Sequence, residues 1–132
     1  MAENKSIAYK KAYTFAIRIV KCCQWLQNEK KEFVLSKQLL RCGTAIGANL
    51  AEANGAISDA DFSAKVSISY KECREVRYWL NLLKDTNYIT NKNFDSIYTD
   101  VEGISKILFA ILKTTRINKC YQKDEAANTA NC

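Results

Sequence analysis

The sequence has no histidine and no proline, and only four of its 132 residues are glycine. Proline interrupts helices and glycine weakens them, so their scarcity favours helical structure throughout the chain. Without histidine the usual general base of enzymes is missing, and so are the nitrogen ligands of many zinc sites. We therefore expect an all-α protein, and a chain of this length forms a single domain with a sizeable core.

Long apolar runs and paired cysteine motifs are also missing. No window approaches the roughly 20 apolar residues that a membrane-spanning helix needs, and the N-terminal residues show no signal-peptide pattern. The six cysteines include no Cys-x-x-Cys pair, which argues against a zinc site or a disulfide framework. Cys23, Cys42 and Cys73 occupy positions that suit small apolar residues, so we interpret them as core thiols in a reducing compartment. These absences predict a soluble cytoplasmic protein with no membrane partner, no metal and no cofactor.

Positive charge exceeds negative charge, and the formal net charge is +6. Residues 1–57 carry nearly all of this excess, whereas residues 58–86 are balanced. A basic excess suits binding to a polyanion such as RNA or DNA, but it is equally a common means of keeping a protein in solution. Charge alone leaves both interpretations open.

Four segments carry apolar residues at alternating spacings of four and three, as on one face of a helix. The segments cover about residues 6–29, 37–53, 59–84 and 94–116. In the first segment the apolar face comprises Ala12, Ala16, Ile19, Cys23 and Leu26. In the second segment this face includes one polar residue, Asn49. Ser36 and Ser58 are the expected N-caps of the second and third helices.

Short polar connections, such as Asp85-Thr86-Asn87, make sequential helices run in opposite directions. The sequence therefore predicts an antiparallel up-down-up-down four-helix bundle over residues 1–119. Residues 120–132 lack a usable apolar face, and we expect them to form a disordered polar tail.

The second helix is rich in small residues. Gly43 and Gly47 lie one turn apart inside it, where each glycine costs up to about 1 kcal/mol relative to alanine. This cost indicates close approach of another helix, either within the bundle or from a neighbouring subunit. A flexible kink is the less favoured explanation.

Motifs of catalysis are absent from the sequence. It contains no Gly-x-x-x-x-Gly-Lys loop and no Gly-x-Gly-x-x-Gly turn. Glu52, Glu72 and Glu75 form the only carboxylate constellation, but the Glu-x-x-His pairs of two-metal bundles cannot exist without histidine. We expect Glu52 and Glu72 to make hydrogen bonds or ion pairs instead, and we expect no enzymatic activity. The candidate partners are Asn49, Lys71 and Arg41.

Basic residues of the first two helices form one candidate surface for binding nucleic acid. They point away from the apolar face of the first helix or lie at the start of the second: Lys10, Lys11, Arg18, Lys21, Lys37 and Arg41. A solvated lysine face without a ligand is an equal alternative.

The outer face of the third helix is a second candidate surface. It carries Tyr70, Arg74, Arg77 and Tyr78 at helical spacing, with Trp79 beside the core seam. Aromatic rings between guanidinium groups can stack on bases, but the same residues are enriched in protein interfaces. The width that Trp79 adds to the apolar surface favours a subunit interface. We assign an interface or structural role also to Asn49, Glu52 and Glu72.

One run of residues, from Asn49 to Leu83, resembles the bacterial 23S rRNA intervening-sequence protein family. The positions that carry the resemblance are Asn49, Glu52, Ser58, Asp61, Phe62, Lys65, Lys71, Glu72, Glu75, Tyr78, Trp79 and Leu80. The similarity extends over roughly residues 9–116. It implies a left-handed four-helix bundle that assembles into ring-like homopentamers with a basic surface. The fold is similar to that of the accessory variability proteins of diversity-generating retroelements, which bind nucleic acid and a reverse transcriptase, and no catalytic residues are established for the family.

Surplus apolar surface also predicts association of subunits, because several apolar residues lie beside the main seams of the third and fourth helices. These residues are Ile68, Trp79, Leu82, Ile107 and Phe109. The leading hypothesis is a non-enzymatic protein that forms a basic homo-oligomeric ring and binds RNA or DNA. The alternative is a protein-interaction scaffold or accessory subunit that has a polypeptide partner and no direct role with nucleic acid.

Overall fold

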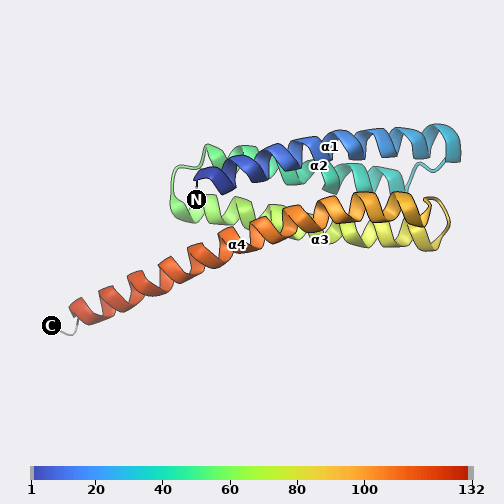
Figure 1. Ribbon diagram of the computed structural model, residues 1–132. Helices are drawn as coiled ribbons and strands as arrows, with labels where there is room; N and C mark the ends of the chain where they lie inside the picture. Colours follow the sequence, from blue (N-terminus) through green and yellow to red (C-terminus); the bar gives the residue numbers. More distant parts are fainter. Residues whose placement is uncertain (1, 131–132) are drawn as a thin grey trace.

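Four helices make up the chain in the computed structural model, which describes the backbone of residues 2–130 and the side chains of residues 5 and 7–115 (Figure 1). The described residues contain no strand, which confirms the all-α prediction. The helices are α1 (Ala2–Lys30), α2 (Leu35–Asn54), α3 (Asp59–Asp85) and α4 (Asn91–Ala130).

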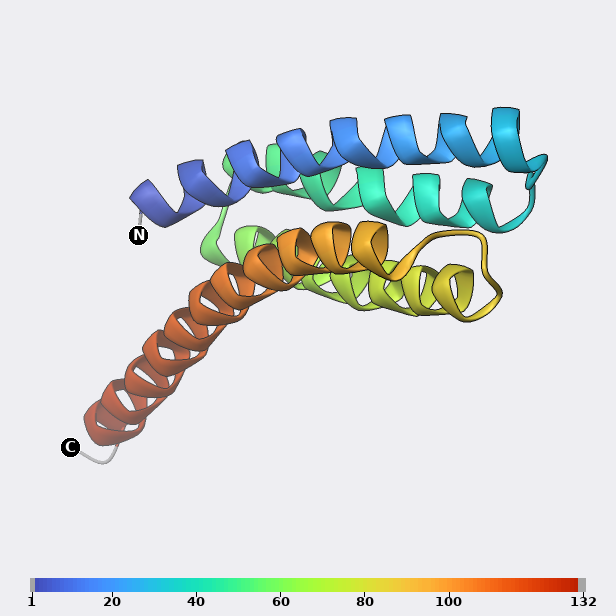
Figure 2. The ribbon, with the colours of Figure 1, turned by 45° about the vertical axis from the view of Figure 1, so that its right-hand side comes forward.

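The helices are arranged as the predicted up-down-up-down bundle. Short connections reverse the chain at alternate ends, so that each helix runs antiparallel to the one before it (Figures 1 and 2). Each described helix contacts two others, and α4 lies against α1, so the four helices form a closed ring within one chain. The α1–α4 contact is the least extensive of the four. None of the described helices is long and apolar enough to cross a membrane.

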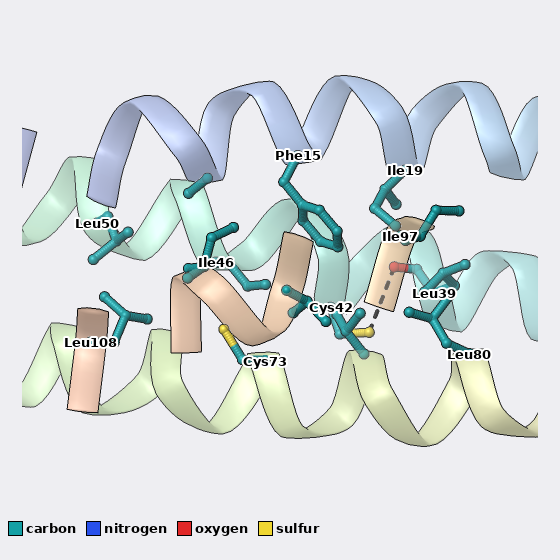
Figure 3. Close-up of a cluster of buried hydrophobic side chains, with 14 of the residues drawn as sticks. Phe15, Ile19, Leu39, Cys42, Ile46, Leu50, Cys73, Leu80, Ile97 and Leu108 are labelled. Atoms are coloured by element: carbon teal, nitrogen blue, oxygen red, sulfur yellow. Dashed lines mark hydrogen bonds between the residues drawn. The ribbon is translucent and has the colours of Figure 1, made fainter. Parts of the chain in front are cut away.

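The core lies along the axis of this ring and receives apolar side chains from all four helices (Figure 3). Cys23, Cys42 and Cys73 are buried within it, as predicted, and burial raises the pKa of each of these thiols to about 12. On α1 the predicted face was shifted at one position. Phe15 is buried and Ala16 is only half-buried, so the larger of these two neighbouring apolar side chains occupies the core.

Gly43 explains the close packing of α1 on α2. A Cβ atom at this position would lie 2.8 Å from Cγ2 of Ile19, which is closer than non-bonded carbons approach. A Cβ at Gly47 would make an ordinary contact of 3.6 Å with the Ala12 backbone. The close approach predicted for this helix therefore occurs within the bundle, and Gly43 is the residue that permits it.

The turn between α1 and α2 is held by Glu32 and not by the predicted cap, Ser36. Glu32 is 7 % exposed, and its carboxylate accepts hydrogen bonds from the backbone N–H groups of Val34 (2.9 Å), Leu35 (2.8 Å) and Ser36 (2.6 Å). Ser36 lies inside α2, where its hydroxyl donates to the Glu32 carbonyl at 2.8 Å. The prediction of Ser36 as N-cap was wrong because a longer acidic side chain from before the helix satisfies the free N–H groups.

We predict that this cap makes the protein sensitive to acid. Burial alone would raise the pKa of Glu32, but the three backbone donors outweigh it and hold this pKa below the ordinary value of 4.5. Because the pKa is lower in the folded than in the unfolded chain, the stabilisation is complete above about pH 5 and is lost as the pH falls through the folded pKa. Urea unfolding between pH 7 and pH 3 should show the loss.

The matched variant is Glu32→Gln, which keeps the shape of the side chain but cannot ionise. It should lower the free energy of unfolding at pH 7 by about 0.5–2 kcal/mol, the usual contribution of a helix cap. The free energy of unfolding of this variant should also change less between pH 7 and pH 3 than that of the parent protein. A variant that loses stability with acid as steeply as the parent protein would contradict the assignment.

The N-cap of α3 was predicted correctly. Ser58 is extended, and its hydroxyl accepts the backbone N–H of Asp61 at 3.0 Å. Asp59 and Asp61 lie in the first turn, where carboxylates face the positive end of the helix dipole.

The fourth helix is longer than expected, since it continues to Ala130 and does not end near Arg116. Neither glycine nor proline follows Gly103, so no strong helix-ending signal interrupts it. Its C-terminal part extends away from the other three helices (Figures 1 and 2). The division into a bundle over residues 1–119 and a disordered tail over residues 120–132 stays a prediction, because the side chains of the tail and its last two residues lie outside the described part.

Candidate nucleic-acid interface

Lysines of α1 and α2 form the exposed part of the predicted basic surface. Lys10, Lys11 and Lys21 project from α1 and Lys37 from the start of α2, and all four are exposed. Within the described part of the chain none of them belongs to an ion pair. Their ammonium groups are therefore free to bind an anion.

Arg18 has a structural partner instead. Its guanidinium pairs with the Asp100 carboxylate of α4 and donates to the Ser96 hydroxyl at 2.8 Å. These contacts join α1 to α4 across the least extensive contact of the bundle. Arg18 and Lys21 line the same hollow, together with Trp25. The guanidinium N–H groups of Arg18 are already bonded to Asp100 and Ser96.

Arg41 faces α3 and does not extend the lysine surface of α1. It pairs with the Glu75 carboxylate and lies 3.8 Å from Glu72, both on α3. The six predicted basic residues are thus not a single surface. Among the described residues, the four lysines have no ion-pair partner, whereas the two arginines join helices.

The predicted residues of α3 divide between two sides of that helix. Tyr70 and Arg77 lie half-buried, and the Tyr70 ring lies 6.2 Å from the Phe109 ring of α4 between centroids. The Arg77 Nε atom is buried and has no hydrogen-bond partner in the described residues. Arg74 is exposed on the same helix.

Tyr78 and Trp79 form an aromatic pair at the surface of α3. Their rings meet edge to face with centroids 4.9 Å apart, and the Tyr78 side chain is 60 % exposed. The Trp79 indole N–H donates to Glu75 at 3.3 Å. Trp79 is therefore held in place by the same carboxylate that binds Arg41.

The carboxylates singled out in the sequence do not converge on one point. Glu52 pairs with Lys65 at 2.7 Å, whereas Glu72 and Glu75 lie further along α3 near Arg41. Asn49 is half-buried and donates to the Ala45 carbonyl of its own helix at 2.8 Å. Glu72 therefore pairs with Arg41, one of the predicted partners, whereas Glu52 pairs with Lys65, which was not among them.

Cys42, Glu72 and Glu75 bring three potential metal-ligand atoms within 4.8 Å of one another. Burial, and then the neighbouring Glu75, raise the pKa of Glu72, and burial raises that of the Cys42 thiol to about 12. A protonated thiol is a poor ligand, and Arg41 already neutralises the carboxylates. This group fits an ion pair better than a metal centre.

A groove between α1 and α4 is the feature that the sequence did not indicate. It has a volume of about 540 Å³, and Lys10 and Lys11 lie along it. Its other lining residues come from both helices and are Thr14, Phe15, Thr99, Asp100, Gly103 and Ile104. The sequence feature that could have indicated the groove is Gly103, because the apolar pattern of this amphipathic helix does not require a glycine there.

Comparison with known proteins agrees with this architecture. Residues 4–110 match the family described as 23S rRNA-intervening sequence protein. A solved structure of a protein with unknown function, from the S23 ribosomal protein family of Bacteroides thetaiotaomicron, is 48 % identical to this chain. It covers 83 % of this chain and 98 % of its own length, with a TM-score of 0.82. No curated protein matches the chain.

Proposed function

The chain belongs to the 23S rRNA-intervening sequence protein family and is similar to a solved protein of unknown function, and we propose that it is a non-enzymatic nucleic-acid-binding protein. The observation that carries the proposal is the group of exposed lysines on α1 and α2, none of which has an ion-pair partner in the described residues: Lys10, Lys11, Lys21 and Lys37.

The proposed mechanism is electrostatic. Ammonium groups that replace counterions along a phosphate backbone release those ions to solvent, and this release drives binding. Such contacts are made to phosphates, so they favour nucleic acid of any sequence. A homo-oligomeric ring, which we propose to be a pentamer, would repeat the lysine surface around an axis and convert weak contacts into avid binding.

Salt-dependent binding tests this proposal. Labelled structured RNA, single-stranded DNA and duplex DNA are titrated with the protein at 50 mM and 200 mM salt, with fluorescence anisotropy as the readout. We expect the affinity for at least one of them to fall steeply with salt. A plot of log K against the logarithm of the salt concentration should have a slope of about −0.7 to −0.9 for each phosphate contact. Lack of binding to all three at low salt would refute the proposal.

Two double variants with the same change of charge provide the control. Lys10→Gln with Lys11→Gln removes two lysines from α1, whereas Lys71→Gln with Lys106→Gln removes two exposed lysines from α3 and α4. The first should weaken binding and reduce the salt slope by nearly two. The second should have a small effect, and equal losses in both would mean that net charge alone governs binding.

A second candidate function is favoured by the exposed Arg74 and Tyr78 of α3 and by the exposed Phe109 of α4. Aromatic and arginine side chains are typical of protein interfaces, so a polypeptide partner would bind the α3–α4 side. Pull-down from the native host after nuclease treatment separates the two functions. A partner that survives the nuclease favours the scaffold, and light scattering of the isolated protein measures the number of subunits.

A further inference from the structure

The groove between α1 and α4 is a hollow that is open to the surface of the bundle. Its lining residues on α1 include Lys10, Lys11 and Thr14, and those on α4 include Thr99 and Gly103. Its volume of about 540 Å³ lies within the range of roughly 300–1,000 Å³ typical of small-molecule sites. The groove lies along the contact between α1 and α4, which is the least extensive in the bundle. The two helices leave a gap there.

Gly103 is not required for packing among the residues that the structure describes. A Cβ atom built at this position meets nothing within 4 Å, and its backbone does not have the positive φ that would require glycine. Inside a helix, glycine costs about 1 kcal/mol relative to alanine. At Gly43 the close packing against Ile19 offsets this cost. At Gly103 no contact in the described residues offsets it. The space beside Gly103 is therefore open to a molecule outside the bundle.

The charges around the groove indicate which kind of ligand enters it. Asp100 is engaged by Arg18, whereas Lys10 and Lys11 have no ion-pair partner in the part of the chain that the structure describes. The Thr99 hydroxyl donates to the Asp95 carbonyl of its own helix at 2.7 Å, so the donors left for a ligand are the two ammonium groups and the Thr14 hydroxyl. These donors suit phosphate oxygens. The two ammonium groups would repel a metal cation and would be costly to bury against an apolar helix.

We propose that this groove holds one nucleotide unit, with its phosphate on Lys10 and Lys11 and its sugar and base against the half-buried Gly103. The unit belongs to a strand of RNA or DNA, and in this respect the inference rests on the proposed function. The same chemistry would also accept a free nucleotide. The groove positions the strand, while Lys21, further along the same side of α1, contacts another phosphate.

Filling the groove without changing its charge tests the inference. Gly103→Ala and Gly103→Leu add one and four carbon atoms where the structure has open space, and both residues form helices better than glycine. Thermal unfolding should show that neither variant is less stable than the parent. We expect Gly103→Leu to weaken binding of a single-stranded 20-nucleotide probe about tenfold and Gly103→Ala to weaken it less. Lys71→Gln serves as the control and should change the affinity less than twofold.

A second arm uses a mononucleotide as the probe. Adenosine monophosphate should shift the backbone amide signals of Thr14 and Thr99 in NMR spectra of the parent protein, and Gly103→Leu should abolish these shifts. If the parent binds this nucleotide in the groove but no oligonucleotide, the groove assignment stands and the proposed function falls.

Three results would overturn the inference. Salt-dependent binding of the oligonucleotide that is equal in Gly103→Leu and the parent would reject the groove and leave the proposed function intact. Binding of neither probe by the parent would reject both. A change in the mass of the assembly on light scattering of Gly103→Leu would place Gly103 in a contact between subunits and not in a ligand site.

Discussion

Replacing Phe15 by alanine is expected to lower the free energy of unfolding by about 3–5 kcal/mol. The ring is 1 % exposed and lies in the core between α1 and the other helices (Figure 3). Its removal forfeits the transfer free energy of a large apolar side chain and leaves a cavity that the rigid bundle fills only in part. Urea denaturation followed by circular dichroism would measure the difference.

Two control variants on the same helix test this explanation. Tyr13→Ala removes an aromatic ring that is 59 % exposed and should change stability far less. Phe15→Leu keeps most of the apolar volume and should be milder than Phe15→Ala. If the Tyr13 and Phe15 alanine variants were equally unstable, the assignment of Phe15 to the core would be wrong.

Gly43→Ala is expected to destabilise the bundle by about 1–3 kcal/mol, even though alanine forms helices better than glycine. The new methyl group would lie 2.8 Å from Cγ2 and 3.0 Å from Cγ1 of Ile19. A β-branched side chain in a helix has one strongly preferred rotamer, so Ile19 cannot simply turn aside. Either α1 and α2 move apart or the side chain is strained. Chemical denaturation of the variant measures the cost.

Alanine at the other interior glycines provides the comparison. Gly47→Ala would make only ordinary contacts, and Gly103→Ala would meet nothing, so both should be neutral or stabilising by up to about 1 kcal/mol. Combining Gly43→Ala with Ile19→Ala should recover part of the loss that the two single variants would show if they acted independently. Additive losses would contradict a clash between these two residues.

The architecture could be predicted from the sequence because it depends on patterns that repeat many times. The four-three spacing of apolar residues recurs over several turns in each helix, so one misplaced residue does not alter the result. This was the case on α1, where Ala16 was chosen and Phe15 is buried. The Ser58 cap was also predictable, since its bond to Asp61 spans three residues.

Features that depend on the distance between helices could not be predicted in the same way. The pairing of Arg18 with Asp100 joins residues 82 positions apart, and that of Arg41 with Glu75 joins residues 34 positions apart. Sequence spacing shows which face of a helix a residue occupies, but not which neighbour lies on that side. For this reason the two arginines were grouped with the free lysines.

Glu32 escaped prediction for a different reason. Acidic residues at the end of a helix and the start of a turn are normally solvated, and the sequence around Glu32 offered a serine at a more usual capping position. Only the folded turn, in which Lys31 takes a left-handed conformation with φ of 52°, brings the carboxylate under the first N–H groups of α2.

The ring-like order of helix contacts has a consequence for how the chain folds. Three of the four contacts join helices that follow each other directly, so they close short loops and form early at little entropic cost. The α1–α4 seam joins the most distant parts of the bundle and has the fewest interactions to offset that cost. It should therefore be the last part of the bundle to close and the first to open in native-state fluctuations. Slow-exchanging amides should accordingly concentrate in α2 and α3. The groove should lie along the α1–α4 edge, where local opening is most frequent.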